Sequence, residues 1–73
     1  MVEVPQLKYW RQQRALTMRE LADKAGVSHM TVFRIEHGKP AGLRTLRKLA
    51  EALGVQPRDL MAPGPDQGQQ EAA

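Results

Sequence analysis

The sequence predicts an all-α domain of five short helices. Apolar residues recur at three- and four-residue spacing, and residues that start or stop helices separate these runs. No run alternates between apolar and polar residues as a half-buried strand would. With 73 residues and no cysteine, the chain forms one small domain that neither disulfide bonds nor a Cys-based zinc finger stabilises.

The first two helices are marked by their ends. One is expected over residues 5–15, because Pro5 suits an early helical position, and Leu7 and Trp10 then face the core. The next is expected over residues 17–26. It begins with a capping box of the form T-x-x-E and ends at a glycine, which readily takes the left-handed conformation that closes a helix.

The remaining three helices follow from apolar spacing. A third is expected over residues 28–37, with Val32 and Ile35 as its inward stripe. A fourth is expected over residues 43–53, where Leu and Ala repeat at three and four residues and a glycine follows. A short fifth helix follows Pro57.

Charge and composition divide the chain into two parts. Residues 5–61 are expected to form the domain, whereas residues 62–73 are rich in Pro, Gly and Gln and are expected to be a disordered tail. All 11 Lys and Arg and five of the eight acids lie between residues 8 and 59, so this stretch carries +6 although the whole chain carries +3. This excess favours a polyanionic partner. No run of 18 apolar residues is present, so no membrane contact is expected.

Residues 17–38 are the most informative stretch. Between the second and third helices, Gly26 permits a sharp turn, Val27 is expected to fill the space between the helices, and Ser28 caps the third helix. The small side chain of Ala22 lets the two helices approach closely. This is the construction of a helix-turn-helix.

A longer pattern surrounds this motif. It reads Leu7-x-x-x-Arg11, then Leu16-Thr17-x-x-x-Leu21-Ala22-x-x-x-Gly26-Val27-Ser28, then Val32-x-Arg34-Ile35-Glu36-x-Gly38, then Thr45-Leu46-x-x-Leu49-Ala50-x-Ala52-Leu53-Gly54-Val55. Over about Leu7 to Leu60, the chain resembles the Cro/C1-type (lambda-repressor-like, XRE) family of DNA-binding domains. The resemblance implies a five-helix domain whose third helix lies in the major groove of double-stranded DNA.

The resemblance assigns two sets of site residues. The base-reading candidates are His29, Met30, Phe33 and Arg34. The candidates for contact with the DNA backbone are Thr17, Met18, Arg19, Ser28, Thr31, Lys39 and Arg44. Arg34 can donate two hydrogen bonds to guanine, whereas Met30 and Phe33 offer only apolar contact, as to a thymine methyl. Two residues depart from the family pattern. Met18 replaces a common Gln and can contact phosphate only through its amide, and Phe33 stands where small polar residues are common.

Some of these residues have a structural alternative. Phe33 can instead be a core residue, Met30 can instead fill the edge of the core, and Arg34 can be a solvated charge. Arg11 and Glu36 stand at positions that the family resemblance pairs, which implies a partly buried ion pair between the first and third helices.

No catalytic motif and no cofactor-binding motif is present. His29 and His37 lack a third metal ligand, so no metal site is expected. Ser28 is better explained as a helix cap than as a nucleophile. The sequence therefore does not predict an enzyme.

The sequence predicts a sequence-specific transcriptional regulator of prokaryotic or phage type, acting on DNA of the cytoplasmic nucleoid. A repressor that binds an inverted repeat as a homodimer is favoured, because one recognition helix reads too few base pairs to select a genomic site. The fifth helix and residues 55–61 are the expected dimer contact. Two alternatives stay open: an antitoxin that also binds a toxin, and a DNA-associated subunit of a larger machine such as a polymerase. The chain can also be one domain of a longer protein.

Overall fold

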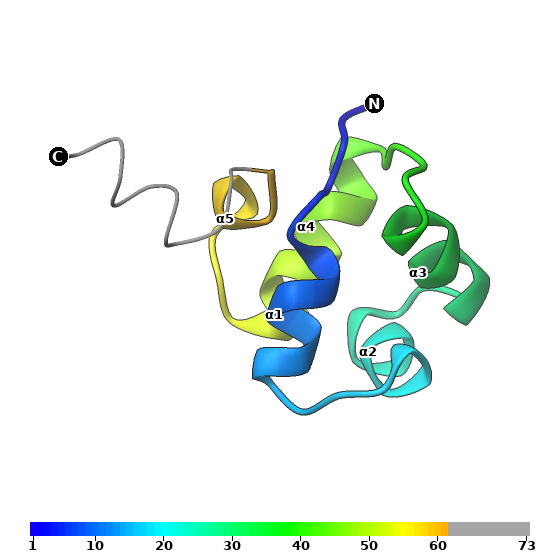
Figure 1. The fold of residues 1–73 in the computed structure, drawn as a ribbon, viewed down its shortest axis with the longest axis vertical. Helices are drawn as coiled ribbons and strands as arrows, with labels where there is room; N and C mark the ends of the chain where they lie inside the picture. Colours follow the sequence, from blue (N-terminus) through cyan, green and yellow to red (C-terminus); the bar gives the residue numbers. More distant parts are fainter. Residues whose placement is uncertain (62–73) are drawn as a thin grey trace, which may run out of the picture.

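The computed structural model describes residues 1–61, and these form five α-helices, as the sequence predicts. The helices are α1 (Leu7–Gln13), α2 (Met18–Ala25), α3 (His29–Glu36), α4 (Leu43–Leu53) and α5 (Pro57–Met61). α2 contacts both α3 and α4, and α5 lies on the other side of α4 (Figure 1). None of these helices is long and apolar enough to cross a membrane. The tail expected at 62–73 lies outside the described residues.

The two helices of the helix-turn-helix begin where the sequence predicts. At α2, the Thr17 hydroxyl accepts from the Glu20 amide at 3.0 Å, and the Glu20 carboxylate accepts from the Thr17 amide at 2.9 Å. At α3, the Ser28 hydroxyl accepts from the Thr31 amide at 3.2 Å. Gly26 has φ of 73°, the left-handed conformation that lets the chain turn between them.

α1 ends slightly earlier than expected, at Gln13 rather than near Ala15. Ala15 itself has φ of 56°, a left-handed conformation that glycine adopts at the ends of α2 and α4. The amide of Leu16 then donates to the carbonyl of Arg11 at 3.1 Å, so the chain folds back over the last turn of the helix.

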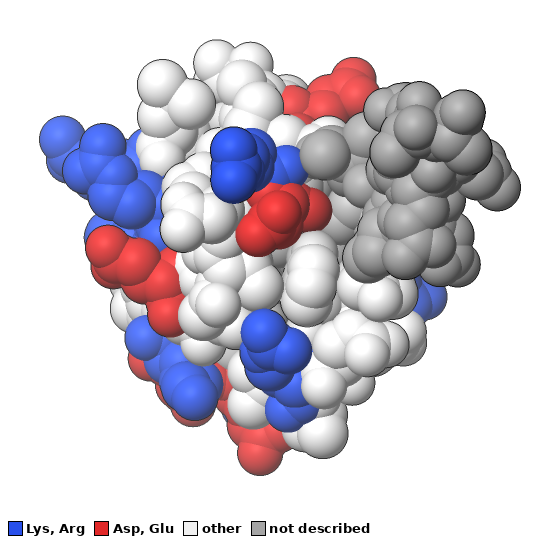
Figure 2. Space-filling model, turned by 90° about the vertical axis from the view of Figure 1, so that its left-hand side faces the viewer, with Lys and Arg blue, Asp and Glu red and all other residues white. Residues whose placement is uncertain are grey.

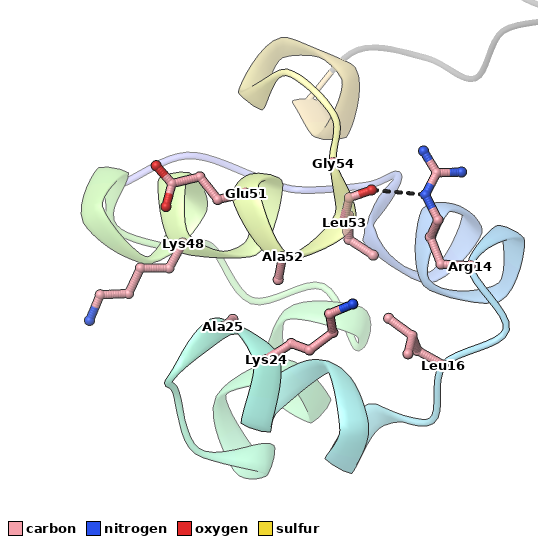
Figure 3. A pocket seen from close by; sticks show the side chains of 9 residues that line it. All are labelled: Arg14, Leu16, Lys24, Ala25, Lys48, Glu51, Ala52, Leu53 and Gly54. Carbon is pink, nitrogen blue, oxygen red and sulfur yellow. Dashed lines mark hydrogen bonds between the residues drawn. The ribbon is translucent and has the colours of Figure 1, made fainter.

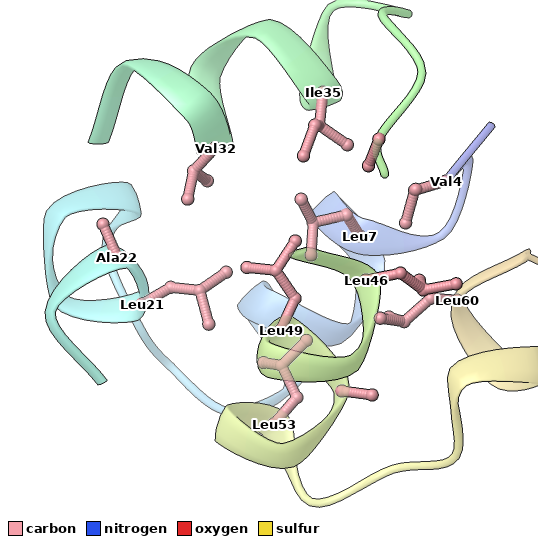
Figure 4. Close-up of a cluster of buried hydrophobic side chains, with 12 residues drawn as sticks. Val4, Leu7, Leu21, Ala22, Val32, Ile35, Leu46, Leu49, Leu53 and Leu60 are labelled. Carbon is pink, nitrogen blue, oxygen red and sulfur yellow. The ribbon is translucent and has the colours of Figure 1, made fainter. Parts of the chain in front are cut away.

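The core is a single cluster of aliphatic side chains in which every helix takes part (Figure 4). Its members are Val4, Leu7, Leu21, Ala22, Val32, Ile35, Ala41, Leu46, Leu49, Ala50, Leu53 and Leu60. Val27, in the turn, packs against this cluster, as predicted. Trp10 packs against the core and is half-buried. Its indole N–H donates to the Asp59 carbonyl at 3.2 Å and joins α1 to α5.

The segment before α1 also packs against the domain. Val2 and Ala41 exchange two backbone hydrogen bonds of 2.8 and 2.7 Å, and Val4 is buried. These residues precede the boundary expected at Pro5. The bridge holds the turn between α3 and α4 in place, and that turn carries Lys39.

An ion pair fixes α3 against α1. Arg11 Nε lies 2.6 Å from Glu36 Oε2, and Arg11 Nη2 lies 3.0 Å from Glu36 Oε1. Arg11 Nη1 donates to the Leu16 carbonyl at 2.8 Å. The two side chains are 12% and 4% exposed, respectively. The structure thus brings together the two residues that the sequence pairs, with bidentate geometry that holds the C-terminal end of α3.

Candidate nucleic-acid interface

The buried residues of α3 determine which of its side chains are exposed. Val32 and Ile35 are buried, so the opposite side of the helix faces solvent. All four base-reading candidates lie exposed there: His29, Met30, Phe33 and Arg34. Phe33 is 41% exposed and Met30 is 43% exposed, so neither fills the edge of the core. The acid of this helix, Glu36, is bound to Arg11. The exposed side of α3 therefore combines apolar and cationic groups.

A pair of stacked rings lies on the C-terminal half of this surface. Phe33 and His37 have ring centroids 4.0 Å apart and ring planes inclined by 30°. His37 Nδ1 lies 2.8 Å from the Phe33 carbonyl oxygen. The assignment of base-reading residues did not include His37. Its spacing of four residues from Phe33 was the available signal, because such residues are neighbours on a helix.

A hollow of about 390 Å³ opens between α3, the following turn and the start of α4. We call it the α3 hollow. Its lining consists of Met1, Thr31, Arg34, Ile35, Lys39, Pro40, Ala41, Gly42 and Thr45. It brings together one base-reading candidate, Arg34, and two backbone candidates, Thr31 and Lys39. It contains two cationic side chains and no acidic one, which suits an anionic ligand.

The backbone candidates differ in accessibility. Thr17, Arg19, Ser28, Lys39 and Arg44 are exposed, whereas Met18 and Thr31 are half-buried. The Met18 side chain packs against the core, so only its amide is available to a phosphate. The hydroxyls of Ser28 and Thr31 lie 3.0 Å apart and share a hydrogen bond.

The N-terminal ends of the helices also differ in how well they suit a phosphate. The first-turn amides of a helix lack partners within it and attract anions. The first turns of α3 and α4 contain no acid, but that of α2 contains Glu20, whose carboxylate already occupies the Thr17 amide. The starts of α3 and α4 are therefore better suited to phosphate than the start of α2.

The face around α5 has a different character. Lys and Arg side chains alternate there with Asp and Glu (Figure 2). Opposite charges that lie close together cancel each other at a distance. Such a face is less suited to a polyanion than the side of the molecule that carries α3.

A cleft of about 570 Å³ lies between the C-terminal ends of α1, α2 and α4 (Figure 3). Its lining consists of Arg14, Leu16, Lys24, Ala25, Lys48, Glu51, Ala52, Leu53 and Gly54. Its titratable side chains, Arg14, Lys24, Lys48 and Glu51, are all exposed, which is not the buried environment that activates a catalytic lysine or carboxylate. Within residues 1–61, no three His, Asp or Glu side chains are grouped so that they could hold a metal ion.

Comparison with known proteins agrees with this geometry. Residues 7–60 match the family model described as helix-turn-helix. The HTH-type transcriptional repressor RghR of Bacillus subtilis is 44% identical over 61 residues, which is 77% of this chain and 43% of RghR. The uncharacterized HTH-type transcriptional regulator MJ0272 of Methanocaldococcus jannaschii is 42% identical over 55 residues, which is 74% of this chain and 83% of MJ0272. The chain thus spans less than half of RghR but most of MJ0272.

Two solved structures share the fold. The restriction-modification controller protein C.AhdI from Aeromonas hydrophila superposes with a TM-score of 0.74 at 33% identity, covering 81% of this chain and 92% of that one. SinR, the master regulator for biofilm formation, was solved in complex with DNA. It superposes with a TM-score of 0.75 at 27% identity, covering 81% of this chain and 98% of that one. The family consists of DNA-binding transcriptional regulators and not of enzymes. The chain described here belongs to this Cro/C1-type (XRE) helix-turn-helix family.

Proposed function

We propose that this protein binds double-stranded DNA in a sequence-specific manner and represses transcription. The exposed side of α3 is the observation that carries the proposal. It presents Arg34 beside Met30 and Phe33, and the acid of this helix is held by Arg11. An α-helix fits the major groove, where each base pair displays a distinct set of donors, acceptors and methyl groups.

The four base-reading residues contribute different chemistry. Arg34 donates two hydrogen bonds to guanine O6 and N7. Met30 and Phe33 contact a thymine methyl, because neither side chain has a hydrogen-bond donor. His29, the first residue of α3, donates to or accepts from a base edge. We therefore propose a half-site that contains at least one guanine and one thymine.

Contacts with the DNA backbone fix the position of α3. Lys39, at the α3 hollow, and Arg44, in the first turn of α4, supply positive charge. Ser28 and Thr31 supply hydroxyls at the start of α3. At the start of α2, Thr17, Met18 and Arg19 make a weaker contact, because the Glu20 carboxylate lies beside them.

The protein acts as a homodimer on an inverted repeat. A single recognition helix contacts only a few base pairs, and two copies one helical turn apart supply the missing selectivity. α5 and residues 55–61 form the dimer contact. In support, Met61 is 41% exposed, whereas Leu60 is buried and fixes α5 to the core.

The experiment is a selection of random duplexes at physiological salt, followed by sequencing of the retained DNA. An enriched inverted repeat with half-sites about one helical turn apart is expected. Arg34→Ala should change the enriched sequence. The matched control is Arg47→Ala, which removes an exposed cation of α4 and should leave the sequence unchanged. Retention without enrichment, lost as salt rises, would mean non-specific binding and would contradict the proposal.

Repression is tested separately in a reporter assay. The enriched repeat is placed over a promoter that drives a reporter gene, and the protein is expressed from a second promoter. Reporter output should fall with the wild-type protein and should not fall with Arg34→Ala. A rise in output would show activation and would overturn this part of the proposal.

A further inference from the structure

We propose that His37 is a positioning residue for base reading by Phe33, and that it sets specificity without touching the base that Phe33 reads. The inference rests on the proposed function. It starts from the stacked pair on α3, where the two ring centroids are 4.0 Å apart. Neither residue belongs to the core, so the stack does not serve to fill the interior.

The imidazole ring is held by the backbone. The Phe33 carbonyl has no hydrogen to donate, so the 2.8 Å contact requires that His37 Nδ1 carries the proton and donates it. This bond fixes the plane of the imidazole ring. Because side chains on a helix lean toward its N-terminus, the ring of His37 extends back over Phe33. The two ring planes are inclined by 30°, which is a stacked arrangement.

Phe33 needs such support to act in the groove. An exposed phenyl ring has several rotamers, and ordering a side chain on binding lowers affinity by about two- to tenfold. A ring already stacked on His37 has lost that freedom before DNA arrives. Contact with a methyl group is short in range, so a thymine is distinguished only when the ring occupies one place. His37 thus converts an exposed apolar side chain into an ordered contact.

The position allows a clean substitution. His37 is the C-cap residue of α3, with φ of −98° and ψ of 20°, outside the left-handed region. Other residues adopt this conformation without strain. A change at His37 therefore alters the side chain while leaving the end of α3 intact. His37→Asn retains a group that can donate to the Phe33 carbonyl but removes the ring. His37→Phe retains a ring but removes the donor.

The test compares these two variants with Phe33→Ala in the selection of random duplexes. The wild-type protein should prefer thymine at one position of each half-site, and Phe33→Ala should lose that preference. His37→Asn should reduce the preference about three- to tenfold, the range expected for an aromatic pair. His37→Phe should reduce it less than His37→Asn does, because the stacked ring remains although the bond that fixes its plane is lost. Thermal unfolding of each variant establishes that the domain is folded.

Two results would overturn the inference. One is a thymine preference that survives in His37→Asn or in Phe33→Ala. The other is an equal loss in His37→Asn and His37→Phe, because the ring would then not be the cause. A purely structural role of His37 would lower the unfolding temperature and weaken all duplexes alike. Failure of the proposed function is a different outcome, in which the wild-type protein itself enriches no sequence.

Discussion

Removal of the Glu36 carboxylate should destabilise the domain strongly. The two side chains of the ion pair are 4% and 12% exposed and share two hydrogen bonds, of 2.6 and 3.0 Å. Glu36→Ala leaves the Arg11 charge without its partner in a mostly buried place, which costs about 3–5 kcal/mol. The lower value, about 3 kcal/mol, applies here because Arg11 retains the Leu16 carbonyl at 2.8 Å and some contact with water.

This loss is large beside the total stability. A domain with 61 described residues has a free energy of unfolding of roughly 3–9 kcal/mol, at about 0.05–0.15 kcal/mol per residue. Urea denaturation followed by circular dichroism measures the change. The control is Glu51→Ala, which removes an exposed acid of α4 and should change the free energy by less than about 0.5 kcal/mol.

A double variant separates loss of the pair from loss of one partner. In Arg11→Met/Glu36→Leu, apolar side chains replace both charges, and most of the stability should return. A loss below about 1 kcal/mol in Glu36→Ala would refute the reasoning, because that value is typical of a solvent-exposed pair. An equal loss of stability in the single and double variants would show that altered packing, and not the unpaired Arg11 charge, causes the destabilisation.

Four further changes test other parts of the molecule. Arg34→Ala should lower affinity for the selected repeat by about 1–3 kcal/mol and relax one base position in a binding titration; equal loss on random DNA would contradict base reading. Lys39→Ala should weaken all duplexes alike and reduce the slope of log affinity against log salt by about one. Leu49→Ala removes a fully buried side chain and should cost about 2–5 kcal/mol in urea denaturation. Gly26→Ala meets no atom within 4 Å, so it should cost only the strain of a left-handed residue, about 1–2 kcal/mol.

The helices were predictable because their signals are local. A capping box at Thr17 and glycines at positions 26 and 54 mark helix ends through contacts within a few residues. The inward stripe of α3 follows from its apolar spacing, and that stripe in turn determines which side chains of the helix are exposed. The location of the base-reading candidates could therefore be deduced from one short stretch of chain.

Other features depend on partners that are distant in sequence. The bridge from Val2 to Ala41 joins single residues, so no periodic pattern in the sequence predicts it. The α3 hollow forms because the turn after α3 runs back beside that helix. The spacing of apolar residues in the sequence does not define the path of this turn. The stack of His37 on Phe33 depends on side-chain rotamers. Trp10 packs against the core but is only half-buried, and its bond to Asp59 joins two residues that are far apart in sequence.

The bridge between Val2 and Ala41 has a practical consequence for labelling. It places Met1 in the lining of the α3 hollow, beside Arg34 and Lys39. A dye or affinity tag attached at that end would sit at the proposed DNA surface and would compete with the ligand. α5, the proposed dimer contact, lies across α4 from this surface (Figure 1). Because the chain contains no cysteine, Glu51→Cys would introduce a unique thiol on an exposed part of α4, outside both the α3 hollow and residues 55–61. A fluorophore there would report DNA binding without blocking either surface.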